Sequence, residues 1–297
     1  MGEGYLERVS AERIGAHIRA LEGVRHPVAA PEALAAAADY VYRSLDALDY
    51  QVEAQVFQAG GKGFRNVIAT RTGARHPEEQ LLVVAHYDTV EDSPGADDNA
   101  SGVAVLLELA RVLEPFAFER TVHFAAVALE EDQQQGPLAG GNKYGSRALA
   151  ARAAQQAWQV DGAIVLESVA YAGEEMAQET PEGLPVTLPE VGNFVTVVGN
   201  EASQGLVERF VYAIARHGIA LPAVPLVVPG KGERFPETRR SDHAPFWDAG
   251  FRAVMLTDTA NFRNPHYHQP TDTSDTLNLD FAANVCRAVG GVVVGEG

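Results

Sequence analysis

Two short runs of this sequence, LLVVA at 81–85 and AIVL at 163–166, are apolar at every position. A strand with one face in water alternates between apolar and polar residues, so uninterrupted runs indicate strands buried on both faces. Six other strand-like runs lie at 50–57, 64–71, 121–131, 193–200, 223–229 and 252–259. The chain is therefore expected to build a sheet of about eight strands with a layer of helices on each side.

Helical patterns supply those two layers. Two precede the first strands, at 10–23, where Ser10 is a suitable cap, and at 31–50. Others separate most of the later strands, at 99–113, 145–157, 203–218, 241–250 and 276–289. This alternation predicts an α/β fold, a three-layer α/β/α sandwich around a mixed sheet. We expect one domain over residues 1–297, with a helical lead-in over about 1–50.

Composition excludes several classes of partner. The chain has 40 acidic residues against 23 basic ones, a net charge of −17, and no dense basic run, so nucleic acid is not expected as a main partner. The single cysteine, Cys286, excludes an internal disulfide and a multi-cysteine metal site, and its helical spacing with apolar neighbours predicts a core position. No apolar run reaches about 18 residues, so no membrane span is expected. The N-terminus lacks the apolar region of a signal peptide, which indicates a cytoplasmic protein or a signal already removed.

Polar residues gather where the predicted strands end. His86 and Asp88 follow one apolar run, Glu130 and Glu131 follow the next, and Glu167 follows a third. Open α/β sheets bind ligands beyond the carboxyl ends of their strands, so these side chains are expected at one edge. Two further contributions come from Asp97 and Asp98, before a predicted helix, and from His268 in a proline-bounded loop.

This combination of residue types favours a metal site. Taken singly, each piece has an ordinary explanation: a turn, a helix cap or a solvated loop. Their joint appearance at successive strand ends favours cation binding. Imidazole and carboxylate without thiolate suits Zn²⁺, with Co²⁺ or Mn²⁺ as substitutes. One carboxylate bridging two ions would give each ion a histidine and two carboxylates.

The same motifs resemble a known family. HYD, PGADDNASG, EE, GS, SDH and NPHYH with a following DT occur in this order between residues 86 and 273. They resemble the zinc-dependent aminopeptidases of the bacterial leucyl aminopeptidase and aminopeptidase Y type, whose fold is a mixed eight-stranded sheet between helices. The resemblance implies a hydrolase that removes N-terminal residues from peptides with two zinc ions per chain. It also implies a cis peptide between Asp97 and Asp98.

Individual roles follow from the resemblance. Asp97 would be the ligand that bridges the two ions. Glu131 and His268 would complete one metal, and His86 and Glu167 the other. The general base would be Glu130, while Asp88 would orient His86. Tyr267 would stabilise the oxyanion.

Departures from the family pattern concern three places. Glu167 stands where many members have aspartate. The segment 132–144 is longer and more polar than the usual short turn, so the adjacent pocket is expected to be remodelled. The polar, proline-rich segment 173–191, predicted to be a surface loop, is also longer than in the compact bacterial enzymes.

Three alternatives remain open at this point. A glutaminyl cyclase on the same fold would use one zinc and a pocket for a glutamine side chain. A carboxypeptidase or deacylase of the related families would usually carry an inserted dimerisation domain, which the sequence does not show. A non-catalytic binding domain would have lost ligands or the base, and none is missing.

Two histidines within the motifs are predicted not to bind metal. His243 begins a helical pattern and is expected to pack there. His266 is two residues from His268 and points the other way if the loop is extended. Arg239 and Arg240 precede SDH, where surface solvation is a more ordinary role than substrate contact.

Overall fold

The computed structural model describes residues 3–132, 138–139, 141–184 and 186–295. Its eight strands form one sheet in the order β1-β2-β4-β3-β5-β8-β6-β7. They span Gln51–Ala59 (β1), Lys62–Arg71 (β2), His76–His86 (β3), Arg120–Val127 (β4), Gln159–Glu167 (β5), Val195–Asn200 (β6), Ala223–Val228 (β7) and Ala253–Thr257 (β8). All eight predicted strands are present, and the mixed sheet confirms the predicted fold class.

Strand directions explain where the site forms. The four central strands β4, β3, β5 and β8 are parallel, so their carboxyl ends lie at one edge of the sheet. β1, β2 and β4 pair antiparallel on one side, and β6 joins β8 antiparallel on the other. The apolar runs 81–85 and 163–166 fall in central strands and are fully buried, as predicted.

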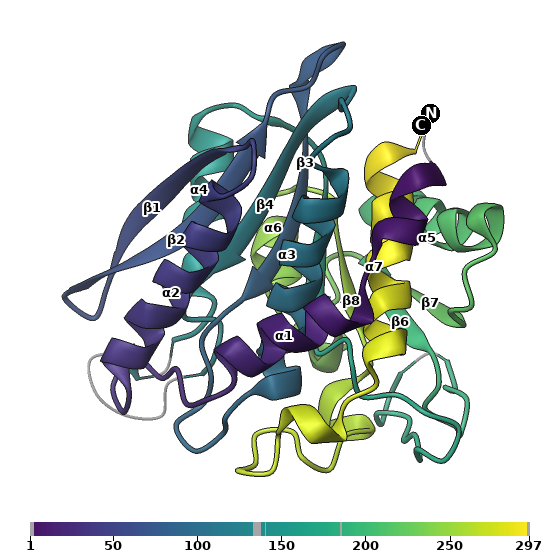
Figure 1. The fold of residues 1–297 in the computed structure, drawn as a ribbon. Coiled ribbons are helices and arrows are strands. Elements are labelled where there is room, and N and C mark those ends of the chain that lie inside the picture. Colours follow the sequence, from purple (N-terminus) through teal and green to yellow (C-terminus); the bar gives the residue numbers. More distant parts are fainter. Residues whose placement is uncertain (1–2, 133–137, 140, 185, 296–297) are drawn as a thin grey trace.

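The helices cover both faces of the sheet, which gives the three layers (Figure 1). Helices α1, α2, α3, α5 and α7 pack on one face, and α4 and α6 on the other. They span Ala11–Leu21 (α1), Pro31–Asp46 (α2), Gly102–Leu113 (α3), Tyr144–Gln155 (α4), Gln204–His217 (α5), His243–Asp248 (α6) and Leu279–Val294 (α7). None of the described helices is long and apolar enough to cross a membrane.

Several local predictions can be checked directly. The Ser10 hydroxyl accepts a hydrogen bond from Arg13 N at 3.3 Å, which confirms the cap of α1. Cys286 lies in α7 and is fully buried, as expected of a core residue. The expected remodelling by segment 132–144 involves residues 133–137 and 140, which lie outside the described residues.

Helix α7 is the centre of the larger hydrophobic core rather than a peripheral cover. It contacts α1, α3 and α5, and the short 3₁₀ helix η1 (Glu3–Arg8) lies along it. The Tyr5 hydroxyl donates to the Arg287 carbonyl at 3.0 Å, and a Cβ at Gly290 would lie 2.4 Å from the Tyr5 ring. The first and last described elements of the chain are therefore packed together.

Candidate metal centre

Four connections that follow parallel strands converge on a single carboxylate, that of Asp98. His86 Nε2 lies 3.2 Å from Asp98 Oδ1 and 3.3 Å from Glu167 Oε2. On the other side of Asp98, His268 Nε2 lies 3.1 Å from Asp98 Oδ2 and 3.2 Å from Glu131 Oε2. In each set of three residues, ligand atoms lie within 4.8 Å of one another. We call His86, Asp98 and Glu167 the first ligand group, and Asp98, Glu131 and His268 the second.

The residue shared by the two groups is Asp98, and the assignment of Asp97 to that position is wrong. Asp97 points away and uses its carboxylate elsewhere: Oδ1 accepts from Ala170 N at 3.1 Å and Oδ2 from Asn264 Nδ2 at 2.9 Å. It also hydrogen-bonds to Asp258, whose pKa burial and the Asp97 charge raise well above the usual range. The cis peptide lies at Asp98–Asn99, one residue later than expected.

Two buried carboxylates hold the acidic pairs of the site by their backbones. Asp88 accepts hydrogen bonds from Glu130 N at 3.0 Å and Glu131 N at 3.2 Å. Asp272 accepts from the amides of the other pair, Asp97 N at 2.9 Å and Asp98 N at 3.1 Å. We call these two residues the backbone clamps. Asp88 Oδ1 also lies 3.6 Å from His86 Nδ1, which has no hydrogen-bond partner among the described residues, so the orienting role of Asp88 stays a prediction.

The turn after β4 explains how neighbouring glutamates reach one site. Leu129 has a φ of 60°, a left-handed conformation that reverses the alternation of an extended strand. Glu131 then lies with Asp98 and His268 in the second ligand group. Glu130 borders a cavity, and its Oε1 lies 3.2 Å from Lys143 Nζ. Lys143 is buried and precedes α4, in a polar segment whose sequence gave no signal for this contact.

The GS and SDH motifs act as supports. Ser241 Oγ donates to Glu167 Oε2 at 2.5 Å and so holds a member of the first ligand group. Ser146 Oγ donates to Asp242 Oδ1 at 2.5 Å, which ties the start of α4 to the start of α6. Hydrogen bonds of this kind orient metal-binding carboxylates from outside the ligand set.

Neither histidine predicted to be a non-ligand belongs to a ligand group. His243 Nε2 contacts the Thr238 carbonyl at 2.7 Å, and its ring packs edge-on against Trp247. His266 Nδ1 lies 2.9 Å from Thr271 Oγ1, and its ring packs against Tyr171. His243 packs within its helix as expected, whereas residues 265–268 form a turn rather than the extended loop on which the prediction for His266 was based.

The site carries more negative than positive charge. Burial raises the pKa of Glu130 well above its usual range, although Lys143 opposes the shift. Burial and the Asp98 charge raise the pKa of Glu131 to about 7. Burial lowers the pKa of His268, but Asp98 and Glu131 outweigh it and raise the value to about 11. Carboxylates packed this densely attract any available cation, including protons on the imidazoles.

Two buried atoms show that the cluster fits a metal ion better than a set of internal hydrogen bonds. Asp98 Oδ1 lies 3.2 Å from His86 Nε2, and His268 Nε2 lies 3.1 Å from Asp98 Oδ2. Within the described part of the chain, however, neither Asp98 Oδ1 nor His268 Nε2 has a partner in hydrogen-bond geometry. Buried polar atoms are normally satisfied, so such atoms call for an explanation. Ligand atoms directed at a common point supply one.

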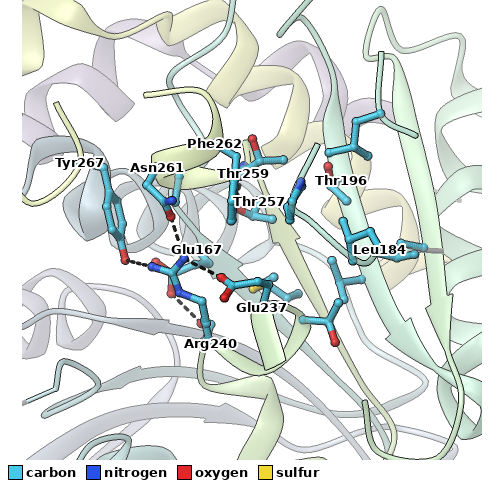
Figure 2. Close-up of a pocket in the computed structure, with 18 of the residues that line it drawn as sticks. Glu167, Leu184, Thr196, Glu237, Arg240, Thr257, Thr259, Asn261, Phe262 and Tyr267 are labelled. Carbon is cyan, nitrogen blue, oxygen red and sulfur yellow. Dashed lines mark hydrogen bonds and ion pairs between the residues drawn. The ribbon is translucent and has the colours of Figure 1, made fainter. Parts of the chain in front are cut away.

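A cavity adjoins the first ligand group at Glu167 and is lined in part by residues of β6, β7 and β8 (Figure 2). The space within it is about 670 Å³ when the open solvent at its mouth is included, and Glu130, Glu167 and Tyr267 border it where it meets the cluster. Most of its wall is apolar: Leu184, Leu188, Val198, Leu226, Met255 and Phe262. Segment 173–191 supplies the first two of these, so the predicted surface loop also forms part of a pocket wall.

Comparisons with known sequences agree on the kind of family. The profile described as peptidase family M28 matches residues 66–293. The protein of Escherichia coli strain K12 described as uncharacterized protein YfbL is 32% identical over 292 residues, covering 94% of this chain and 86% of that protein. A probable zinc metalloprotease of Leptosphaeria maculans is 29% identical over 228 residues, which cover 71% of this chain and 50% of that longer protein.

Solved structures share the fold. An aminopeptidase from Aneurinibacillus sp. strain AM-1 superposes with a TM-score of 0.71 at 18% identity, covering 97% of this chain and 94% of its own. A glutaminyl cyclase from Macrostomum lignano gives 0.75 at 20% identity, with 98% and 90% covered. At these identities the likeness concerns the fold, which both kinds of enzyme share.

Proposed function

The chain belongs to peptidase family M28, and from this membership and the geometry around Asp98 we propose that it is a two-zinc aminopeptidase. The sharing of one buried carboxylate between two imidazole-containing groups carries the proposal. The first ligand group would hold one ion and the second the other, with Asp98 common to both. Co²⁺ and Mn²⁺ are the expected substitutes because they accept the same ligands.

Hydrolysis then needs a Lewis acid, a base and a donor for the developing negative charge. Zinc in a site of this kind lowers the pKa of water toward 7 and polarises a carbonyl oxygen. Glu130 borders the cavity beside the ligand groups, so its carboxylate can take a proton from the attacking water and pass it to the leaving amine. Lys143 beside it keeps a positive charge within 3.2 Å of that carboxylate.

Tyr267 is the proposed donor for the oxyanion. Its ring stacks on His268 with centroids 3.9 Å apart and planes 15° apart, which fixes it beside the second ligand group. The residue also borders the cavity together with Glu130 and Glu167. A hydroxyl held there can donate to the carbonyl oxygen as negative charge develops.

Charge and cavity shape favour an N-terminal residue as the part of the peptide that is recognised. A free α-ammonium is attracted by the excess of carboxylates, whereas a terminal carboxylate is repelled. The residue whose carbonyl lies at the cluster can place its side chain in the apolar cavity. We therefore propose peptides with a free N-terminus and a large apolar first residue as substrates.

The test combines metal content with a substrate panel. Protein dialysed against chelator and reloaded with zinc is assayed on leucyl, phenylalanyl, alanyl, glutamyl and lysyl p-nitroanilides, and on N-acetyl-leucyl p-nitroanilide as the matched blocked control. We expect two zinc ions per chain, release of apolar residues first, and no turnover of the blocked substrate. Chelator alone should abolish activity.

The same protein is tested on an N-terminal glutaminyl peptide to separate the cyclase alternative. A cyclase would release ammonia, leave the peptide chain intact and hold one zinc per chain. That outcome, with no hydrolysis of any aminoacyl substrate, contradicts the proposed function.

A further inference from the structure

Arg240 borders the cavity and connects two segments that line it, its own segment and the loop after β8. Its Nη1 donates to Glu237 Oε2 at 3.0 Å on its own segment and to Asn261 Oδ1 at 2.7 Å in the loop after β8. Its Nη2 donates to the Tyr267 hydroxyl at 3.3 Å. Figure 2 shows the guanidinium at the centre of these three contacts, facing the same space as Glu167.

The direction of the hydrogen bond to Tyr267 is fixed by chemistry. A guanidinium has five N–H donors and no acceptor, so the phenol oxygen must accept. The phenol proton is then directed away from Arg240. In the described part of the chain no other group forms a hydrogen bond with this hydroxyl, so its proton is available to a ligand in the cavity.

Two contacts together fix the Tyr267 side chain. Stacking on His268 holds the ring plane, and Arg240 lies 5.7 Å from the ring centroid while contacting the hydroxyl. A hydroxyl that accepts from a cation becomes a stronger donor, because hydrogen bonds in a chain polarise one another. The arrangement exists before any substrate binds, so the donor needs no reorganisation during reaction.

We propose that Arg240 is a positioning residue that aims and polarises the Tyr267 hydroxyl toward the reacting carbonyl oxygen. The proposal rests on the aminopeptidase function and on the role given there to Tyr267. It assigns Arg240 no contact with the substrate. Its effect should therefore appear in kcat rather than in KM, and should disappear when the Tyr267 hydroxyl is absent.

Arg239 is a matched control for Arg240. It is the same residue type at the adjacent position, but its Nη2 donates to Asp248 at 2.8 Å and it does not border the cavity. Loss of either arginine removes one positive charge from the same surface region. Only loss of Arg240 removes a contact to Tyr267.

The experiment is a double-mutant cycle on the zinc-loaded enzyme. Arg240→Met, Tyr267→Phe, the double variant and Arg239→Met are compared in kcat and KM on the best substrate of the panel. Tyr267→Phe should lower kcat by about 10²-fold, the effect of losing one oxyanion donor. Arg240→Met should lower it by about 10-fold with little change in KM, and the double variant should match Tyr267→Phe. Arg240→Lys should recover only part of the loss, since a single ammonium cannot hold Tyr267 and Asn261 together.

A second readout does not depend on turnover. A leucine boronic acid, whose tetrahedral boronate carries the charge expected of the intermediate, should bind Arg240→Met about 10-fold more weakly than wild type. The Arg239→Met variant should bind it as wild type does.

Three outcomes overturn the proposal. If the losses from Arg240→Met and Tyr267→Phe multiply in the double variant, Arg240 acts independently of Tyr267. If Arg240→Met raises KM alone, the guanidinium binds substrate directly. In both cases an active wild type leaves the aminopeptidase function intact, whereas a zinc-loaded wild type without any hydrolysis overturns both proposals together.

Discussion

Two acidic pairs in this molecule are held by the same device and yet use their side chains differently. Glu130–Glu131 and Asp97–Asp98 each have both backbone amides bound by one backbone clamp, Asp88 or Asp272. In the glutamate pair, both side chains serve the site: Glu130 borders the cavity, and Glu131 belongs to the second ligand group. In the aspartate pair only Asp98 does so.

The difference shows what a backbone clamp does and does not decide. It fixes where two consecutive amides lie. The surrounding hydrogen-bonding groups then determine where each side chain points. Asp97 accepts from a backbone amide in the loop after β5 and from a carboxamide in the loop after β8. Glu130 instead faces Lys143 at the edge of a cavity. The four predictions that follow can break this comparison or sharpen it, beginning with the largest effect.

The largest effect is expected from exchanging aspartate for asparagine within the first pair. Asp98→Asn should remove most metal from both ligand groups, and activity with it, because both groups share this carboxylate. Asp97→Asn should keep two metals per chain and lose about 1–3 kcal/mol of unfolding free energy, since it perturbs buried hydrogen bonds. Metal analysis and denaturant unfolding of the two variants measure this. Metal loss confined to Asp97→Asn would restore the bridging role to Asp97.

The second test separates the two glutamates. Glu130→Gln keeps the size of the side chain but cannot accept a proton, so kcat should fall by about 10²–10⁴-fold while metal content stays near wild type. Glu131→Gln should lower metal occupancy and activity together. The measurement is metal per chain alongside kcat. If Glu130→Gln strips metal and Glu131→Gln retains it, the two roles are exchanged.

The clamps themselves give the third test. Asp88→Asn and Asp272→Asn should each weaken zinc binding by about 10–100-fold, as losses of supporting residues do. At saturating zinc, Asp272→Asn should recover kcat, because the Asp272 carboxylate binds the amides of Asp97 and Asp98 rather than that of the proposed base. Asp88→Asn should not recover it fully, because it also holds the amide of Glu130. Equal recovery of both variants would mean that the Glu130 backbone needs no clamp.

The smallest effect is expected at His243, which lies in a motif but in neither pair. His243→Gln should leave two metals per chain. Burial lowers the pKa of His243 to about 3, so between pH 6.5 and 3 the unfolded chain binds a proton that the folded chain does not. This residue therefore costs stability as pH falls below 6.5, by about 1.4 kcal/mol per pH unit. The variant should flatten that slope, measured by urea unfolding at pH 7, 6 and 5, and a variant as steep as wild type would contradict the assignment.

The fold was predictable because its signals repeat along the chain. Buried strands need apolar residues over several consecutive positions, and the helices between them need a period near 3.6. Both patterns can be recognised even where the predicted end of a strand or helix is wrong by one or two residues. The order of the strands in the sheet was not predicted, because it depends on contacts between segments far apart in sequence.

The site was predictable in residue type but not in every position. His86, Glu131, Glu167 and His268 follow strands or sit in recognised loops, and the structure brings them together. Whether Asp97 or Asp98 faces the ligand groups depends on the conformation of the loop at a single residue. Hydrophobic periodicity carries no information about that conformation.

Two buried basic residues near the site were not predicted, because neither belongs to a motif or to a periodic pattern. Lys143 comes from an irregular polar segment, and nothing in its neighbours indicates an ion pair with Glu130. Arg25 lies between two helices, and its buried guanidinium donates to the carbonyls of Pro94 and Gly95 in the loop that carries Asp98. Long side chains that reach across loops depend on tertiary structure alone.

The central position of α7 has a consequence for how the protein is made. A chain emerging from the ribosome folds from its N-terminal end as far as its contacts allow. Every residue of the two ligand groups and both clamps is synthesised by residue 272, but α1, α3 and α5 lack their common packing partner until residues 279–294 have followed. A nascent chain stopped before α7 would expose the apolar faces of those helices, and it would meet chaperones or aggregate before its carboxylates could gather a metal.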